Sequence, residues 1–147
     1  MKVLLVCSGN TCRSPMAEAL MKREASRRGI SGLDIQSAGL QAAPGSRASK
    51  YAVEAMAARD IDIGRRQAVQ ISAQMVQEAN LVLTMTRQQA YTLIEELPQY
   101  GHKVLALCDY TGVGGDVEDP WLGSGADYER VAQQLEEMVS VALDRLC

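Results

Sequence analysis

Residues 2–20 read KVLLVCSGNTCRSPMAEAL, and the rest of the chain is expected to be arranged around this stretch. Residues 3–6 form an apolar run that predicts a buried strand. Small and polar residues follow it, and Ser14-Pro15 opens a helix, because proline is well tolerated in the first helical turn. A strand, a tight loop and a helix N-terminus in this order indicate an anion cradle, since free backbone amides and the positive end of the helix dipole meet there.

The cradle carries a thiol and a guanidinium. Cys7 and Arg13 are separated by five residues, which is the spacing of a C-x5-R phosphate loop. The amides of so short a loop point inward at one tetrahedral oxyanion, and Arg13 can donate two parallel hydrogen bonds to it. Helix N-termini and cations stabilise a thiolate. Cys7 is therefore predicted to be a nucleophile lying beneath the phosphorus.

Other loop residues are suited to supporting this site. Gly9 permits the tight turn, and Asn10 tolerates a left-handed backbone and can tie the loop to its surroundings. The hydroxyl of Ser14 can donate to the thiolate or cap the helix, and the two roles are compatible. Cys12 has two interpretations: a thiol that traps oxidised Cys7 as a reversible disulfide, or a small buried residue that fits the loop.

A phospho-cysteine mechanism also needs a proton donor for the leaving group and a base for water. Asp119 is the natural candidate, because Pro120 stiffens the loop behind it and Trp121 can form a wall of the pocket. The alternatives are that Asp119-Pro120 is only a turn and that Trp121 is a core residue. In combination with a C-x5-R loop, the catalytic interpretation is favoured.

Composition restricts the class of protein. The chain has 147 residues, close to half of them hydrophobic, which predicts a single domain over 1–147. A net charge of -3 argues against nucleic-acid binding, and no apolar run has the length of a membrane span. With no signal-peptide pattern, we expect a cytoplasmic monomer. The four cysteines lack paired CxxC spacing and His102 is the only histidine, so we expect neither a metal nor a cofactor.

The remaining chain alternates strand and helix patterns, which predicts an α/β sandwich with a mostly parallel sheet. Residues 61–71 are expected to form a loop or a short strand, with Arg65-Arg66 as a solvated pair. Residues 108–125 form a long, acidic, glycine-rich loop, and such loops are often functional. Further strands are predicted at 33–39, 80–85 and 103–107, and helices at 14–28, 49–59, 72–79, 86–97 and 127–146.

The motif VCSGNTCRSPMAE at 6–18, with Ser37-Ala38-Gly39 and Asp119-Pro120-Trp121, resembles the low-molecular-weight protein tyrosine phosphatase family. The resemblance covers essentially the whole chain. It implies a four-stranded parallel sheet flanked by helices, with the phosphate loop after the first strand, and phosphorylated proteins as substrates. It implies these roles: nucleophile for Cys7, phosphate clamp for Arg13, general acid and base for Asp119, loop support for Asn10 and Ser14, and substrate binding for Ser8, Gly9, Asn10, Thr11, Cys12 and Trp121.

Thr11 departs from the tyrosine phosphatases of this family, which usually carry a bulky aliphatic residue there. Bacterial protein-arginine phosphatases resemble this chain in having threonine. A phenyl ring favours an apolar wall, whereas a guanidinium needs acceptors such as the Thr11 hydroxyl and the Asp119 carboxylate. Residues 16–20 and Met85-Thr86 also resemble the arginine-phosphatase branch. Phosphoarginine is therefore the expected substrate, with an ordinary loop threonine as the alternative interpretation.

Three other functions compete with this one. A phosphotyrosine phosphatase is the main alternative, supported by Trp121 as an aromatic wall. An arsenate reductase shares the loop but needs a relay of further cysteines, and Met85 stands where one is expected, while Cys108 and Cys147 are not closely spaced. A phosphocarrier would hold phosphate on Cys7, yet it would need neither Arg13 nor Asp119.

Overall fold

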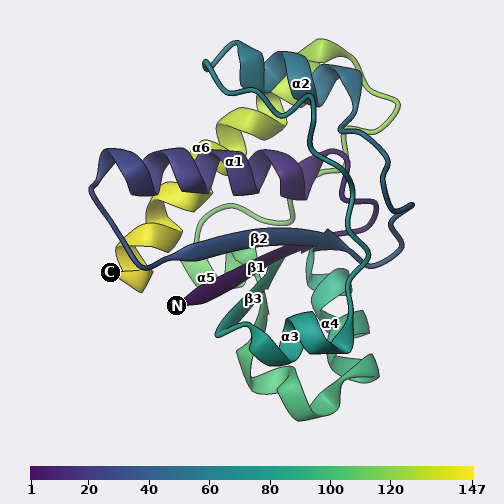
Figure 1. Ribbon diagram of the computed structural model, residues 1–147, viewed down its shortest axis with the longest axis vertical. Coiled ribbons are helices and arrows are strands. Elements are labelled where there is room, and N and C mark those ends of the chain that lie inside the picture. Colours follow the sequence, from purple (N-terminus) through teal and green to yellow (C-terminus); the bar gives the residue numbers. More distant parts are fainter.

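The computed structural model, which describes residues 1–147, contains one four-stranded parallel sheet between two layers of helices (Figure 1). The strand order is β2-β1-β3-β4, so the N-terminal strand lies inside the sheet. The predicted three-layer α/β sandwich with a four-stranded parallel sheet is confirmed. The strands are β1 (Lys2–Cys7), β2 (Asp34–Gly39), β3 (Leu81–Thr84) and β4 (Val104–Ala106).

The central strands are buried because helices cover both faces of the sheet. β1 is buried from Val3 onward and β3 along its whole length, which explains their unbroken apolar sequences. The register sets Cys7 beside Gly39 and Val6 beside Thr84. The carboxyl ends of three strands therefore meet at one edge, where ligands bind in open parallel sheets.

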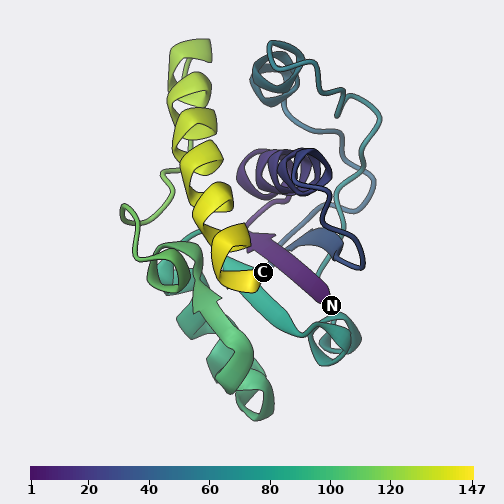
Figure 2. The same ribbon diagram turned by 90° about the vertical axis from the view of Figure 1, so that its left-hand side faces the viewer.

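The helices form two layers on opposite faces of the sheet. Figures 1 and 2 show α1, α2 and α6 on one side and α3 and α4 on the other. Two apolar cores follow from this, a larger one under α1 and α6 and a smaller one under α3 and α4. The helices are α1 (Arg13–Arg27), α2 (Lys50–Ala57), α3 (Ala73–Glu78), α4 (Arg87–Glu96), α5 (Leu107–Thr111), α6 (Gly125–Leu146) and the 3-10 helix η1 (Pro98–Lys103).

The predicted strands and helices are all present, but the region after β3 differs in detail. β4 ends at Ala106, and Leu107 already belongs to α5, which occupies the start of the expected long loop. The turn after α4 is the 3-10 helix η1. Helices of one or two turns carry too few residues for a clear apolar period, so the sequence did not reveal them.

Residues 61–71 form a loop and contribute no strand. Two isolated bridges hold it, one pairing Gln67 with Arg47 and the other pairing Gln70 with Gly39. The loop is thereby fixed beside the carboxyl end of β2. None of the helices has the length and apolarity needed to cross a membrane.

Candidate active site

The loop of residues 7–13 joins β1 to α1 at the carboxyl edge of the sheet. Asn10 has a φ of 57°, the left-handed conformation that asparagine tolerates better than most residues. The loop lies directly on the end of β2: a Cβ placed on Gly39 would be 2.6 Å from the Ser8 carbonyl oxygen and 3.0 Å from the Asn10 nitrogen. A glycine at this position therefore allows the loop to approach.

The Cys7 thiol is buried and faces hydrogen-bond donors. The Asn10 amide donates to Cys7 Sγ at 3.2 Å, and Ser14 Oγ lies 2.8 Å from the sulfur. Because Asn10 Nδ2 donates to Ser14 Oγ at 2.7 Å, the hydroxyl proton is free to point at the sulfur. The Cys7 sulfur thus faces one backbone donor and one hydroxyl. The capping role considered for Ser14 is not found: α1 begins at Arg13 and has no side-chain cap.

Arg13 links this loop to the loop that follows α5. Its guanidinium is almost fully buried, and Nη1 donates to the carbonyl of Val117 at 3.0 Å. Nη2 lies 3.6 Å from Asp119 Oδ2, and Asp119 Oδ1 accepts the Trp121 amide at 3.0 Å. Val117 in turn donates its amide to the Met85 carbonyl at 2.9 Å. The late acidic loop is thus held against the end of β3, with Asp119 at the rim of the site.

These residues line one cavity of about 380 Å³. Every predicted site residue except Ser14 contributes to it, and Ser14 lies behind the loop on Cys7. Trp121 is 66% exposed, so it is a wall of the cavity and the core interpretation is wrong. Gln41 was not predicted; its place just after the carboxyl end of β2 is the signal that could have found it. The lining residues are Cys7, Ser8, Gly9, Asn10, Thr11, Cys12, Arg13, Gln41, Asp119 and Trp121.

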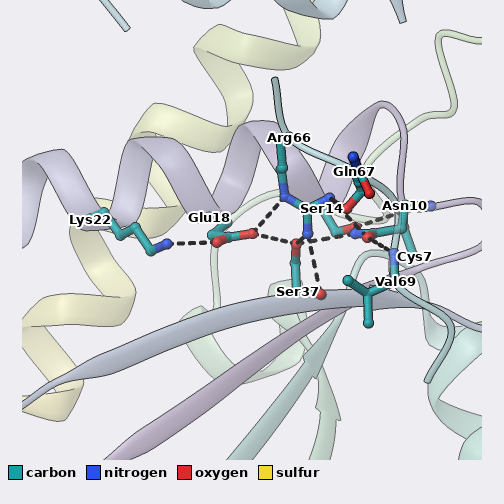
Figure 3. Close-up of polar contacts among 9 residues, drawn as sticks. All are labelled: Cys7, Asn10, Ser14, Glu18, Lys22, Ser37, Arg66, Gln67 and Val69. Atoms are coloured by element: carbon teal, nitrogen blue, oxygen red, sulfur yellow. Dashed lines mark hydrogen bonds and ion pairs between the residues drawn. The ribbon is translucent and has the colours of Figure 1, made fainter. Parts of the chain in front are cut away.

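Arg66 holds the carboxamide of Asn10 in place (Figure 3). Its Nη1 donates to Asn10 Oδ1 at 2.9 Å, and the amide of Val69 donates to the same oxygen at 2.9 Å. With Oδ1 engaged by two donors, the Asn10 amide nitrogen must face Ser14. The expectation that Arg65-Arg66 is a solvated pair is therefore wrong for Arg66, although Arg65 is exposed. The reason is tertiary, because the partners of Arg66 are distant in sequence.

Glu18 and Ser37 complete this network. Glu18 accepts from Arg66 Nε at 3.0 Å, from Ser37 Oγ at 2.5 Å and from Lys22 at 2.7 Å. Burial alone would raise the pKa of Glu18, but the hydrogen bonds from Lys22 and Ser37 and the charge of Arg66 hold its pKa below the usual value. Glu18 thus stays ionised and neutralises Arg66 behind the loop. Arg66 Nη2 also donates to the Ser37 carbonyl at 3.2 Å and to its hydroxyl.

Gln89 ties the loop to the opposite layer. Its Nε2 donates to Ser8 Oγ at 3.0 Å, while its Oε1 accepts the amides of Met85 and Thr86 at 3.1 and 3.0 Å. The same side chain completes the capping box of α4. A Thr-x-x-Gln pattern before an apolar run is the sequence signal for the cap, but its contact with Ser8 depends on the fold.

Cys12 packs on α6. Its sulfur lies 3.4 Å from the Tyr128 hydroxyl and 3.5 Å from Ser49 Oγ. Burial, together with the neighbouring Cys12, raises the pKa of Tyr128 to about 12, so the phenol stays protonated.

The other two cysteines lie outside the catalytic cavity. Cys108 is buried and burial raises the pKa of its thiol, whereas Cys147 is exposed at the chain end.

Comparison with known proteins agrees with this geometry. A protein-arginine-phosphatase of Bacillus subtilis (strain 168) is 39% identical over 140 residues, covering 95% of this chain and 92% of the relative. A probable low molecular weight protein-tyrosine-phosphatase, EpsP of Ralstonia nicotianae, is 32% identical over 144 residues, covering 98% and 94%. A solved structure of a YwlE arginine phosphatase mutant with a phosphorylated active site serine superposes with a TM-score of 0.95 at 37% identity, covering 99% of this chain and 95% of that one.

The family comparison spans almost the whole chain. The profile described as low molecular weight phosphotyrosine protein phosphatase matches residues 2–146, which include the Cys7 loop, Arg66 and Asp119. The chain belongs to the low molecular weight phosphotyrosine protein phosphatase family.

Proposed function

We propose that this protein is a cysteine-dependent phosphatase that removes phosphate from phosphoarginine side chains of proteins. The observation that carries the proposal is the contact of 2.8 Å between Ser14 Oγ and the buried Cys7 sulfur, inside a loop built to hold an oxyanion. Arg13 and Asp119 lie beside the same cavity, so a phosphate clamp and a proton carrier are both within reach. Together these groups provide what hydrolysis through a covalent intermediate requires.

In the first step, the loop amides and the guanidinium of Arg13 bind the phosphoryl oxygens. The Cys7 thiolate attacks phosphorus, an S–P bond forms and the P–N bond breaks. Asp119, as the carboxylic acid, gives its proton to the departing guanidine nitrogen. The products are a phospho-cysteine and an arginine guanidinium, because P–N cleavage of the phosphorylated guanidinium leaves the electron pair on nitrogen and the proton from Asp119 adds to it.

In the second step, Asp119 acts as a base. Its carboxylate accepts a proton from a water molecule, whose oxygen attacks phosphorus as the S–P bond breaks. Cys7 leaves as a thiolate, and the donors from Asn10 and Ser14 stabilise the charge that returns to its sulfur. Inorganic phosphate is released, and Asp119 is again protonated for the next cycle.

The preference for phosphoarginine is argued from Thr11. Thr11 is one of the residues that line the catalytic cavity. A hydroxyl there can accept from the guanidinium of the substrate, and a recognition site that offers a hydrogen bond can discriminate by orders of magnitude. The Bacillus subtilis relative, whose name specifies arginine, supports the same preference.

Replacing Thr11 tests this preference. The unmodified protein is expected to hydrolyse phosphoarginine in proteins far better than phosphotyrosine, and Thr11→Ile is expected to reverse the order, because isoleucine removes the acceptor and adds an apolar wall. Turnover of both substrates is measured side by side for the two proteins. Equal or faster phosphotyrosine turnover by the unmodified protein would overturn the assignment to phosphoarginine.

Phosphotyrosine hydrolysis is the second candidate. The exposed Trp121 at the cavity wall favours it, because an indole can pack against a phenyl ring. The name of the Ralstonia relative supports the same reading. The chemistry at Cys7 is unchanged in this case, except that the P–O bond breaks and Asp119 protonates a phenolate oxygen.

The two remaining alternatives receive less support. An arsenate reductase needs a thiol relay, but Met85 is fully buried at the end of β3 and Cys108 and Cys147 do not form a close pair. A phosphocarrier would have no use for Asp119 beside the Arg13 guanidinium. Rapid hydrolysis of a small aryl phosphate, without arsenate-dependent thiol oxidation, would argue against both.

We also propose that Cys12 protects Cys7 from irreversible oxidation. Peroxide oxidises the Cys7 thiolate to a sulfenic acid, and attack by the Cys12 thiol on that sulfur forms a disulfide and releases water. After peroxide and then a thiol reductant, the unmodified protein should regain activity and Cys12→Ser should not. Mass mapping should find the Cys7–Cys12 bond, and equal recovery of both proteins would contradict this role.

The working form of the protein is proposed to be a cytoplasmic monomer that acts on phosphorylated proteins and uses no nucleic acid. The absence of a membrane-spanning helix is consistent with this location. Cys7, Arg13 and Asp119, the three catalytic groups of the proposed mechanism, line one cavity of a single chain.

A further inference from the structure

A second cleft, of about 410 Å³, adjoins the catalytic cavity. The two share Ser8, Arg13 and Gln41, so the cleft begins where a bound phosphate would lie. Leu40 and Gln41, after the end of β2, form one wall, and α4 forms the other. We call this space the α4 cleft, and none of the catalytic steps described above uses it.

The length of the α4 cleft exceeds what one phosphorylated side chain needs. Gln88, Thr92 and Glu96 all line it and are spaced four residues apart, so they form one stripe along α4. Eight residues of helix span about 12 Å. An extended polypeptide covers that distance with about three to four residues.

The side chains at the two ends of this stripe, Gln88 and Glu96, are free to bind a ligand, whereas the Thr92 hydroxyl donates to the Gln88 carbonyl at 3.0 Å. Gln88 and Glu96 are exposed, and their side-chain polar atoms take part in no hydrogen bond or ion pair within the protein. An amide such as that of Gln88 both donates and accepts, which matches the groups of a peptide backbone. By contrast, Gln89 beside it is buried and fully engaged with Ser8 and the amides before α4. The wall of the cleft is therefore rigid where it meets the phosphate loop.

The charge of the α4 cleft changes along its length. Arg13 is the only basic residue that lines it, at the end shared with the catalytic cavity, and Glu96 is the only acidic one, at the last turn of α4. The phosphate end therefore attracts an anion and the far end a cation. A ligand that matches both ends carries a phosphate at one end and a basic group at the other, with a segment along the stripe from Gln88 to Glu96, which spans about 12 Å, between them.

We propose that the α4 cleft holds the extended segment of the substrate protein that adjoins the phosphorylated residue, with a lysine or arginine three or four positions away facing Glu96. This rests on the proposed phosphatase function and specifies its substrate. The Gln88 side chain forms hydrogen bonds with the backbone of that segment, and the Glu96 carboxylate forms an ion pair with its basic side chain. The segment leaves the catalytic cavity past Ser8 and Gln41.

The test compares matched phosphopeptides that carry either lysine or glutamine three or four positions from the phosphorylated residue, on each side in turn. A phosphoarginine series and a phosphotyrosine series are used, and kcat/KM is measured. The unmodified protein should prefer the lysine peptide on one side. Glu96→Gln should lower kcat/KM for that peptide about two- to fivefold, as expected for an exposed ion pair, and remove the preference.

Two further variants distinguish the loss of hydrogen bonds to the substrate backbone from the loss of a negative charge elsewhere on α4. Gln88→Ala should lower kcat/KM about two- to tenfold for lysine and glutamine peptides alike, because it removes hydrogen bonds to the backbone. Glu95→Gln is the matched control, since Glu95 is also exposed on α4 but does not line the cleft. It should keep the preference for lysine. Turnover of p-nitrophenyl phosphate, which is too small to reach the stripe, should be unchanged in all three variants.

Each result has a defined meaning. A lysine preference that survives Glu96→Gln, or equal kcat/KM for all peptides with normal p-nitrophenyl phosphate turnover, would overturn the α4 cleft proposal alone. An unmodified protein that hydrolyses neither p-nitrophenyl phosphate nor any peptide would overturn the proposed phosphatase function, and the cleft proposal with it.

Discussion

Single side-chain atoms determine the shape of the phosphate loop. The Asn10 carboxamide uses both its ends: Oδ1 accepts from Arg66 and Val69, and Nδ2 donates to Ser14 and Ser37. Aspartate has the same shape but has no amide protons, so it would lose both donated bonds and place a carboxylate near the Cys7 sulfur. The residue that tolerates the left-handed backbone is thus also the one whose side chain the site requires.

The absence of a side chain at Gly39 also determines the shape of the phosphate loop, because it leaves room for the loop to lie against β2. Gly39→Ala places a methyl group against the Ser8 carbonyl and the Asn10 amide, so the loop must move away from β2. Overpacking of this kind costs about 1 to 3 kcal/mol of unfolding free energy. We expect that loss in urea denaturation, together with slower turnover of a small aryl phosphate.

The matched control for this substitution is Gly115→Ala. Nothing lies within 4 Å of a Cβ placed on Gly115, and its backbone is not in the left-handed region. Stability and turnover should both be unchanged. If Gly39→Ala behaved like Gly115→Ala, the close approach of the loop to β2 would be of no consequence.

At the scale of elements, Arg66 joins the loop of residues 61–71 to α1, through Glu18, and to β2, through Ser37. Arg66→Ala removes several charge-assisted hydrogen bonds and leaves Glu18, largely buried, with fewer partners. The expected loss of unfolding free energy is about 2 to 3 kcal/mol. Turnover should fall as well, because Asn10 loses one of the two donors that orient it.

Arg65→Ala is the control for this experiment. Arg65 is adjacent, carries the same charge, is exposed and makes no hydrogen bond or ion pair. Both variants are compared by urea denaturation and by kcat with a small aryl phosphate. If the two variants had equal stability and equal kcat, Arg66 would contribute no more than a solvated arginine, as expected from sequence.

The elements themselves show where local pattern is informative. The apolar runs before Cys7 and before Met85 predicted β1 and β3, because strands covered on both faces need apolar residues at every position. The regular stripe of α6 likewise predicted a long amphipathic helix. By contrast, α5 and η1 were not predicted, since their five or six residues are too few to establish a period and neither has a side-chain cap such as Ser72, which marks the equally short α3.

At the scale of the whole molecule, the site combines segments from opposite ends of the chain. Asp119 reaches the Cys7 loop because Val117 bonds both to Met85 at the end of β3 and to Arg13. Asp119→Asn keeps the shape of the side chain but can neither give nor accept the proton. We expect kcat for a phosphorylated peptide to fall about 10² to 10⁴-fold, the usual contribution of a general acid or base.

The neighbouring Glu118→Gln provides the comparison for this loss. Glu118 is exposed and does not line the catalytic cavity, so its substitution should leave kcat nearly unchanged. Acid quenching during turnover would show which step is slowed. If Asp119→Asn removes the base needed for water attack, phospho-cysteine accumulates. Equal kcat for Asp119→Asn and the unmodified protein would exclude Asp119 from proton transfer.

The sequence by itself determined the class of fold, the phosphate loop and the pairing of Cys7 with Arg13, because these depend on neighbours within one strand–loop–helix unit. It also singled out Asp119, through its Pro120-Trp121 context and a family resemblance. Only the tertiary structure assigned the site roles of Arg66 and Gln89 and revealed the α4 cleft, since the contacts of Arg66 with Asn10 and Ser37 and of Gln89 with Ser8 join residues 29 to 81 positions apart. Local patterns report which face of an element is buried, but a polar contact between distant segments depends on how the sheet and its two helical layers are assembled.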